Sequence, residues 1–324
     1  MKLFAGFDGG GSKTRVAVAD ERGRVLGRGE TGLANLHHAP EAEVRANLAR
    51  ALALALEPVG GKPADVASVF FGMAGVTCEA TAGRFRGMAA DIGLGAARFG
   101  IDHDIRIALA GGLMGRPGIA LIVGTGSACY GRNADESTWQ TGGWGYLVAD
   151  EGSGYDLGRR AMTVAVRMSD GRMVPGPLRD LVFGFLEVRG VQEILVRLYE
   201  RGIGRNEIAS LAPRIVAQAE AGDAVARGIL ESGAAELGAM VSANHRALPT
   251  SETPEVVITG GLGSAPTLYR ELIRGAIRGR LTGVRLPEPA LEPVLGAVLL
   301  ALGPGDPGVK AAWGENLRAT ASMG

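Results

Sequence analysis

The stretch Asp8-Gly9-Gly10-Gly11-Ser12-Lys13-Thr14 (DGGGSKT) decides how the first part of the chain folds. An apolar run, Lys2–Phe7, comes before it, and Thr14–Ala19 after it alternates polar and apolar residues. Since period-two alternation is typical of a β-strand, we expect the glycines to form the turn of a β-hairpin. A P-loop would need a different spacing between its last glycine and its lysine, and a helix after the loop. The sequence therefore excludes a P-loop here.

The number of glycines in this hairpin favours a binding role over an ordinary turn. Three consecutive glycines exceed what a two-residue turn needs, and bare backbone N–H groups can approach phosphate oxygens. Asp8, at the end of the strand, is a candidate ligand for Mg²⁺. Lys13 or Thr14 is a candidate phosphate contact. The alternative is an ordinary hairpin with a solvated Asp8.

Two further glycine turns follow buried-type strands. Ile119–Val123 runs into Gly124-Thr125-Gly126-Ser127, and the chain resumes as a strand over Cys129–Arg132. Together with the first hairpin, this turn has the composition to clamp a triphosphate. Val256–Thr259 opens into Gly260-Gly261-Leu262-Gly263. This last turn fits a nucleotide base or ribose lying against bare backbone, and equally a strand and a helix that simply pack closely.

Acidic residues mark two other candidate positions. Asp104 follows the expected strand Arg98–Asp102 and opens a helix, which suits a general base. Aspartate is also a preferred N-cap, and the residues alone favour that role, with Asp102 as a rival for either. The stretch Gly142–Tyr146 (GGWGY) precedes Asp150–Gly154 (DEGSG). A tryptophan among glycines suits the face of a sugar, and carboxylates accept hydrogen bonds from sugar hydroxyls.

The alternative for Gly142–Gly154 is an ordinary loop in which Asp150 and Glu151 cap the next helix. Asn35, in an early loop, is a further candidate sugar contact.

The order of the elements predicts an α/β fold, because strands that end in glycine recur with helices between them. The other expected elements are a helix over Glu41–Leu56, a strand over Val66–Met73, a mainly helical region from Asp156 to about His245, a helix over Tyr269–Ile277, a short strand over Val284–Leu286 and an apolar helix over Pro293–Leu302. Glycines and a proline over Gly111–Pro117 interrupt the pattern. We expect one domain over residues 1–115, to which the C-terminal helix at 293–324 returns, and a second over 116–292.

Composition excludes several classes of protein. The 324 residues include 34 Lys+Arg and 34 Asp+Glu, so no net charge favours nucleic acid or a membrane surface. No stretch approaches the roughly 18 apolar residues of a membrane span, and the apolar run before Asp8 is too short for a signal peptide. Cys78 and Cys129 have no partner motif, which argues against a disulfide framework or a zinc site and fits the cytoplasm.

Taken in order, these motifs resemble the BadF-type ATPase and N-acetylglucosamine kinase family of the actin/hexokinase-like superfamily. The resemblance is carried by DGGGSKT at 8–14, Ala34-Asn35, Asp104, GTGS at 124–127, GGWG at 142–145, DEGS at 150–153, GGLG at 260–263 and Leu295-Gly296-Ala297. It spans nearly the whole chain, and GTGS, GGWG and DEGS in this order are specific. It implies two ribonuclease-H-like lobes around an interdomain cleft, with ATP and Mg²⁺ as cofactors.

The resemblance also implies roles for individual residues. Asp104 matches the family's catalytic base, which reverses the preference for a cap, and would deprotonate the 6-hydroxyl of the sugar. Asp8 would hold the metal. The residues implied for ATP are Gly9, Gly10, Gly11, Ser12, Lys13, Thr14, Gly124, Thr125, Gly126, Gly260, Gly261 and Gly263. Those implied for the sugar are Asn35, Asp104, Thr125, Ser127, Gly143, Trp144 and Asp150.

The function that the resemblance implies is a kinase that makes the 6-phosphate of N-acetylglucosamine, with a glucosamine or muramic-sugar kinase as the alternative. A further alternative is an ATPase that activates a partner protein, and another is a non-catalytic sugar sensor. Cys78 and Cys129 lack the paired spacing of the iron–sulfur ATPases, and the cysteine cluster of the neighbouring repressor/kinase family is absent from the sequence. Family members are often dimers, so we also expect a homodimer.

Overall fold

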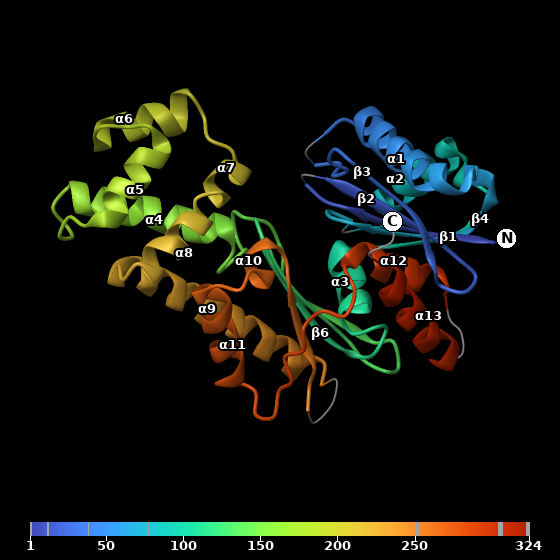
Figure 1. The fold of residues 1–324 in the computed structure, drawn as a ribbon. Helices are drawn as coiled ribbons and strands as arrows, with labels where there is room; N and C mark the ends of the chain where they lie inside the picture. The colour runs from blue at the N-terminus through green and yellow to red at the C-terminus, as the bar shows by residue number, and fades with distance from the viewer. Residues whose placement is uncertain are drawn as a thin grey trace. The chain divides into compact units, whose positions relative to one another are not determined.

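The computed structural model describes residues 2–11, 13–37, 39–76, 78–249, 253–303 and 307–321 (Figure 1). Its contacts divide the chain into two compact units. Unit 1 consists of residues 1–120 and 288–324, and unit 2 of residues 121–287. Each unit combines one β-sheet with helices, which confirms the predicted α/β class.

Unit 1 is built on a five-stranded sheet in the order β3-β2-β1-β4-β5. Its strands are β1 (Leu3–Gly9), β2 (Thr14–Asp20), β3 (Val25–Thr31), β4 (Val66–Met73) and β5 (Arg98–Asp102). The first three strands pair antiparallel, as the glycine hairpin predicts, and β4 and β5 continue the sheet in parallel with β1. The register places Asp8 opposite Gly72 and Gly72 opposite Asp102, so the carboxyl ends of three strands meet at one edge.

Helices cover both faces of this sheet, and β2 shows why its sequence suits that position. The helices are α1 (Glu41–Leu56), α2 (Glu79–Ala89), α3 (Asp104–Gly112), α12 (Pro293–Ala301) and α13 (Pro307–Thr320), with short turns η1 (Glu57–Val59), η2 (Pro63–Asp65) and η3 (Ala90–Leu94). Val16 and Val18 point into a core shared with α1 and α2, while Ala17 and Ala19 point into a core shared with α12 and α13. Successive strand residues face opposite sides, so both must be apolar here.

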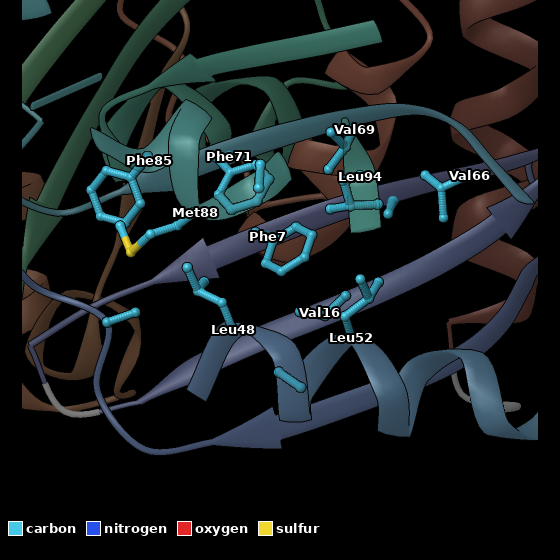
Figure 2. Close-up of a cluster of buried hydrophobic side chains, with 14 of the residues drawn as sticks. Phe7, Val16, Leu48, Leu52, Val66, Val69, Phe71, Phe85, Met88 and Leu94 are labelled. Atoms are coloured by element: carbon cyan, nitrogen blue, oxygen red, sulfur yellow. The ribbon is translucent and has the colours of Figure 1, made fainter. Parts of the chain in front are cut away.

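The core under α1 contains several of the largest fully buried side chains of unit 1. Phe7 of β1 stacks on Phe71 of β4 with ring centroids 4.1 Å apart, and Leu48 and Leu52 of α1 close the cluster (Figure 2). Such a stacked aromatic pair adds roughly 1 kcal/mol beyond the burial of its area. This cluster fixes β1, and therefore the position of Asp8 at its end.

On the other face, α12 lies directly against the sheet although it comes from the end of the chain (Figure 1). A Cβ atom at Gly6 of β1 would collide with the backbone of Val298 in α12. Gly296 of α12 and Gly111 of α3 meet in the same way, with backbone against backbone. Glycine is needed at these three positions because two backbones approach closely, not because of an unusual dihedral angle.

Unit 2 has a four-stranded sheet in the order β8-β7-β6-β9. Its strands are β6 (Gly118–Val123), through which the boundary between the units runs, β7 (Ser127–Arg132), β8 (Thr138–Gly142) and β9 (Val256–Thr259). Its helices are α4 (Gly154–Ser169), α5 (Pro177–Leu186), α6 (Val191–Leu195), η4 (Val196–Glu200), α7 (Arg205–Ala209), α8 (Ala212–Glu220), α9 (Ala224–Ala247), α10 (Gly261–Ser264) and α11 (Leu268–Arg278). The helical region predicted from Asp156 to about His245 is confirmed.

The prediction of a strand over Val284–Leu286 is wrong. Only Arg285 forms a bridge, to Glu255, and the segment is otherwise irregular. Gly283 adopts a left-handed conformation just before it, and Pro287 just after it has no N–H to continue a ladder. Conversely, β8 was not predicted, because Thr138–Gly142 lacks the apolar alternation that marks a strand in sequence.

Candidate functional site

The glycine hairpin of unit 1 joins β1 to β2. The Gly10 N–H donates to the Lys13 carbonyl at 2.9 Å, and the Ala34 N–H donates to the Gly10 carbonyl at 3.2 Å. Gly9 packs against the Met73 side chain, so its missing side chain is needed for packing. Ser12 lies outside the described residues. Gly10 has open surroundings, because an added Cβ would come no closer than 3.5 Å to another atom.

The two polar side chains that follow in this hairpin differ in what they can offer a ligand. Lys13 is exposed and its ammonium lies 3.6 Å from Glu30, a loose ion pair that a phosphate can compete with. Thr14 is fully buried, and its hydroxyl donates to the carbonyl of Gly32 at 2.8 Å. In this geometry the Thr14 proton stabilises the neighbouring chain and is not offered to a phosphate.

Asp8 and Asp104 lie at the same edge of the sheet. Burial raises the pKa of Asp8 to about 7, and the negative charge of Asp104 adds to this rise, against the opposing charges of Arg15 and Lys13. The pKa of Asp104 is also raised, chiefly by burial, although the neighbouring His103 and backbone N–H groups oppose the shift. Two carboxylates with raised pKa values are suited to holding a cation or accepting a proton.

The structure bears on both alternatives to Asp104 as a base, namely that Asp104 is an N-cap and that Asp102 is the base. Helix α3 starts at Asp104, but His103 occupies the N-cap position, so the cap interpretation of Asp104 is wrong. Asp102, the rival carboxylate, accepts a hydrogen bond from Arg106 at 2.6 Å and lies 3.2 Å from the His103 ring. Asp102 is thus committed to an ion pair, and Asp104 is the better candidate for a base.

Asn35 is drawn towards the glycine hairpin because its neighbour Ala34 is hydrogen-bonded to Gly10. Its side chain is buried, and its Oδ1 accepts from the backbone N–H of His37 at 2.9 Å. The bond fixes the amide, so that its Nδ2 group is presented in one orientation as a donor.

A different set of contacts holds the turn Gly124–Ser127 in unit 2. The Gly154 N–H donates to the Gly124 carbonyl at 2.8 Å, and the Tyr155 N–H donates to the Thr125 carbonyl at 3.2 Å. The Ser127 hydroxyl donates to the Glu151 carbonyl at 2.7 Å. The first turn of α4 and the segment before it are therefore hydrogen-bonded to the glycine turn. The Thr125 side chain stays exposed.

Asp150 is the buried acidic residue of this network. It is only 3% exposed and has a left-handed backbone with φ of 69°. Its Oδ1 accepts from the Ser127 N–H at 3.1 Å, and its Oδ2 forms an ion pair with Arg205 at 2.6 Å. The expectation that Asp150 or Glu151 caps the next helix is wrong, because Ser153 caps α4.

Sequence reasoning missed Arg205, which begins α7. Its distance of 55 residues from Asp150 left no local signal of the pairing. A Cβ at Gly126 would touch the Arg205 guanidinium and would lie 2.8 and 3.0 Å from the two Asp150 oxygens. The bare backbone at Gly126 therefore makes room for the ion pair.

The turn Gly260–Gly263 packs against the end of β6. Gly260 has φ of 89° and ψ of 162°, and a Cβ there would lie 2.5 Å from the Val123 carbonyl oxygen. A Cβ at Gly263 would lie 2.9 Å from Ile258. Both of these glycines are required by packing, whereas a Cβ at Gly261 would meet nothing within 4 Å. Only Gly261 therefore presents open backbone.

The segment after β8 remains largely exposed. Gly142, Gly143 and Gly145 all have positive φ, and a Cβ at Gly143 would lie 2.8 Å from the Cβ of Ala128, next to Ser127. Trp144 is 63% exposed. An exposed indole on a glycine segment beside the Ser127 turn is suited to contacting a ligand.

Unit 1 also contains a pocket of about 370 Å³ whose lining includes none of the predicted residues. It is lined by Arg15, Val16, Arg28, Gly29, Glu30, Glu292 and Val294. Arg28 pairs with Glu292 at 2.6 Å and Arg15 with Glu30 at 2.9 Å, so its charges balance. The same Arg15 and Glu292 act on the pKa of Asp8 with opposite signs.

Two features are absent from the part of the chain that the structure describes. No helix there is long and apolar enough to cross a membrane. No group of three or more His, Cys, Asp or Glu side chains is arranged there to enclose a metal ion. Mg²⁺ commonly binds one or two protein carboxylates together with the phosphates of a nucleotide.

Comparison with known proteins gives concordant results. The sequence model of the BadF/BadG/BcrA/BcrD ATPase family matches residues 5–301. The chain is 31% identical over 303 residues to an N-acetylmuramic acid/N-acetylglucosamine kinase of Clostridium acetobutylicum, covering 93% of this chain and 98% of that protein. It is 25% identical to an N-acetyl-D-glucosamine kinase of Dictyostelium discoideum, with the same coverage.

The fold is also similar to a solved structure. A protein of Chromobacterium violaceum assigned as an N-acetylglucosamine kinase matches with a TM-score of 0.75 and 28% identity, covering 93% of this chain and 99% of that one. The two α/β units thus have the actin/hexokinase-like fold that the motifs predicted.

Proposed function

The chain belongs to the BadF/BadG/BcrA/BcrD ATPase family, and we propose that it is an ATP-dependent kinase that phosphorylates an amino sugar at its 6-hydroxyl group. N-acetylglucosamine is the substrate we expect, with glucosamine or a muramic sugar as the alternatives. The kinases to which the chain is similar over nearly its whole length support this substrate class. We also propose a cytoplasmic homodimer, since Cys78 and Cys129 form no disulfide and thus fit a reducing compartment.

The observation that carries the proposal is that two carboxylates, Asp8 and Asp104, lie at the same edge of the unit 1 sheet. Asp104 is half-buried, its pKa is raised by burial, and Asp102 beside it is occupied by Arg106. A carboxylate with a raised pKa is a stronger proton acceptor, which is what deprotonation of a sugar hydroxyl requires.

In the proposed reaction, Asp104 takes the proton of the 6-hydroxyl as that oxygen attacks the γ-phosphorus of ATP. The new O–P bond forms while the bond from the γ-phosphorus to the bridging oxygen breaks, and ADP leaves with that electron pair. The N–H group of Gly11, the turn at Gly124 and Thr125 and the ammonium of Lys13 would stabilise the phosphate charge. The Gly10 N–H is engaged by the Lys13 carbonyl, so Gly10 would contribute room for a close approach of phosphate. Thr14 is better assigned to holding the hairpin, because its hydroxyl is committed to Gly32.

Mg²⁺ would be held at Asp8, together with the phosphates of the nucleotide. Burial and, next, the charge of Asp104 raise the pKa of Asp8, and a bound cation would relieve the repulsion between the two carboxylates, so the residues fit the metal. When bound, Mg²⁺ supplies neutralisation of phosphate charge.

Five further residues would contact the sugar. Asn35 would donate from Nδ2, and Asp150 would accept from sugar hydroxyls. The exposed Trp144 would cover one face of the ring. Thr125 and Gly143 would complete the site from the turn and the glycine segment. Ser127 acts in this scheme by orienting Asp150, because its N–H donates to that carboxylate.

The experiment that tests the proposal measures ADP release with N-acetylglucosamine, glucosamine, N-acetylmuramic acid and glucose. We expect turnover that depends on an amino sugar. ATP hydrolysis that is equally fast without any sugar would instead favour the ATPase that activates a partner protein.

Substitution of the two neighbouring carboxylates assigns the base. Asp104→Asn should lower kcat by about 10²- to 10⁴-fold while ATP still binds, since general-base catalysis contributes on this order. Asp102→Asn is the matched control, because it removes a carboxylate two residues away that is engaged by Arg106. A loss of activity in Asp102→Asn with normal kcat in Asp104→Asn would overturn the assignment.

A further inference from the structure

Arg205 occupies an energetically unfavourable position, because one of its buried donors has no hydrogen-bond partner among the described residues. It is the first residue of α7, a helix of five residues, and 28% of its side chain is exposed. Its Nε is buried and has no hydrogen-bond partner among the described residues. Leaving a buried donor unpaired is unfavourable. Costs of this kind are retained at functional sites more often than elsewhere.

What Arg205 does at this position is hold Asp150. The guanidinium Nη2 lies 2.6 Å from Asp150 Oδ2, and only 4% of the Asp150 side chain is exposed. Asp150 has a left-handed backbone, a conformation that persists in a non-glycine residue only where surrounding contacts impose it. The ion pair is the strongest of these contacts in the described network.

Arg205 also reaches the segment that carries Trp144. Its Cζ lies 5.5 Å from the centroid of the Tyr146 ring, in cation–π range, and Tyr146 packs edge-on against Tyr155 at 5.1 Å. One guanidinium therefore contacts both the carboxylate and the aromatic segment on which the proposed sugar contacts depend.

The carboxylate keeps capacity for a ligand while it is held. A carboxylate has about four acceptor sites, and the Ser127 N–H and Arg205 occupy two of those on Asp150. The sites left are those that two hydroxyl groups of a sugar ring would use.

We propose that Arg205 is a positioning residue of the sugar site, which acts on the substrate through Asp150. This inference rests on the proposed amino-sugar kinase function. Arg205 fixes the Asp150 carboxylate and, through Tyr146, the approach of the segment that follows β8. It contacts no reacting atom.

The test compares Arg205→Ala, Arg205→Lys, Asp150→Asn and the double variant Arg205→Ala/Asp150→Asn by steady-state kinetics with N-acetylglucosamine. Arg201→Ala is the matched control, because Arg201 is exposed, lies four residues earlier and contributes to no part of the site. For Arg205→Ala we expect kcat/KM for the sugar to fall about 10²-fold, the loss typical of a misplaced binding group, with KM for ATP changed less than about twofold.

Rescue and additivity distinguish positioning from a general structural role. Lysine restores the charge without the planar fork, so Arg205→Lys should recover part of the sugar kcat/KM. The double variant should be no worse than Asp150→Asn, because Arg205 acts through Asp150. Arg201→Ala should match the wild type.

Three outcomes would overturn the inference and leave the proposed function in place. Normal sugar kinetics in Arg205→Ala would do so alone, and so would fully additive losses in the double variant. An equal rise of both KM values together with a lowered Tm would indicate a structural role. A wild-type protein that phosphorylates no amino sugar would instead overturn the proposed function, and this inference with it.

Discussion

The two glycine turns that follow β1 and β6 arise from the same sequence pattern but are supported in different ways. The hairpin at Gly9–Lys13 is held by main-chain bonds to its own strands and to Ala34, and Lys13 stays exposed. The turn at Gly124–Ser127 is held from outside by Asp150, Glu151 and the start of α4. A strand running into glycines therefore predicts a turn, but not whether distant side chains fix its geometry.

The largest loss of stability is expected at Gly260, which packs against Val123 directly before the turn at Gly124–Ser127. Gly260→Ala would require a backbone conformation that is essentially confined to glycine and would push a methyl group to 2.5 Å from the Val123 carbonyl oxygen. Strain and overpacking together should cost about 3 kcal/mol or more of the free energy of unfolding. Urea denaturation followed by circular dichroism measures this loss of unfolding free energy.

Gly261→Ala is the control for that variant, because a Cβ there meets nothing within 4 Å. We expect its unfolding free energy to stay within about 0.5 kcal/mol of the wild type, since Gly261 is exposed at the start of the short helix α10 and has no positive φ. Equal destabilisation by the two alanines would contradict the packing explanation.

The second prediction places the same substitution in each glycine turn. Gly126→Ala would drive a methyl group into the Asp150–Arg205 ion pair, and sugar kcat/KM at saturating ATP should fall about 10²-fold. Gly10→Ala adds a methyl group in ordinary contact at 3.5 Å, so it should leave stability intact and raise KM for ATP if phosphate approaches this backbone. A lowered sugar kcat/KM in Gly10→Ala, or an unchanged one in Gly126→Ala, would contradict the proposed difference between the two turns.

The third prediction concerns the hydroxyl at each turn. Thr14→Val keeps the volume of a fully buried side chain but leaves the Gly32 carbonyl without its donor, which should cost about 1–2 kcal/mol of unfolding free energy. Ser127→Ala removes the bond to the Glu151 carbonyl and should cost about 1 kcal/mol. Measurements of kcat separate the two, because only Ser127→Ala should loosen the segment that carries Asp150. Unchanged stability in Thr14→Val would restore Thr14 as a candidate phosphate contact.

These contrasts explain which parts of the molecule the sequence predicts. Strands β4 and β9 and helix α1 were predicted with their observed bounds, because apolar periodicity is a local property. The prediction that Asp104 is a base came only through resemblance, since nothing local in the sequence separates a base from a cap. Arg205 could not be predicted at all, because its pairing with Asp150 depends on the folded arrangement of α7 and the turn.

The last and smallest prediction uses the turn at the other end of β2, where a buried carboxylate is held by its own neighbours. Burial would raise the pKa of Asp20, but hydrogen bonds from the backbone and side chain of Arg24 and from the Arg22 N–H outweigh it and leave the pKa lowered. A lowered folded-state pKa means that this contribution to stability is present above the unfolded value of about 3.9 and is lost as the pH falls through the folded value.

Asp20→Asn should therefore be less stable than the wild type at pH 7 by about 1 kcal/mol, and the difference should shrink as the pH falls below about 4. Urea denaturation at pH 7 and at successively lower pH values measures both numbers. A difference that stays constant with pH would mean that the loss comes from packing and not from the charge. Because the hydrogen bonds that the Asp20 carboxylate accepts all come from Arg22 and Arg24, this turn tests the local kind of support that Gly124–Ser127 lacks.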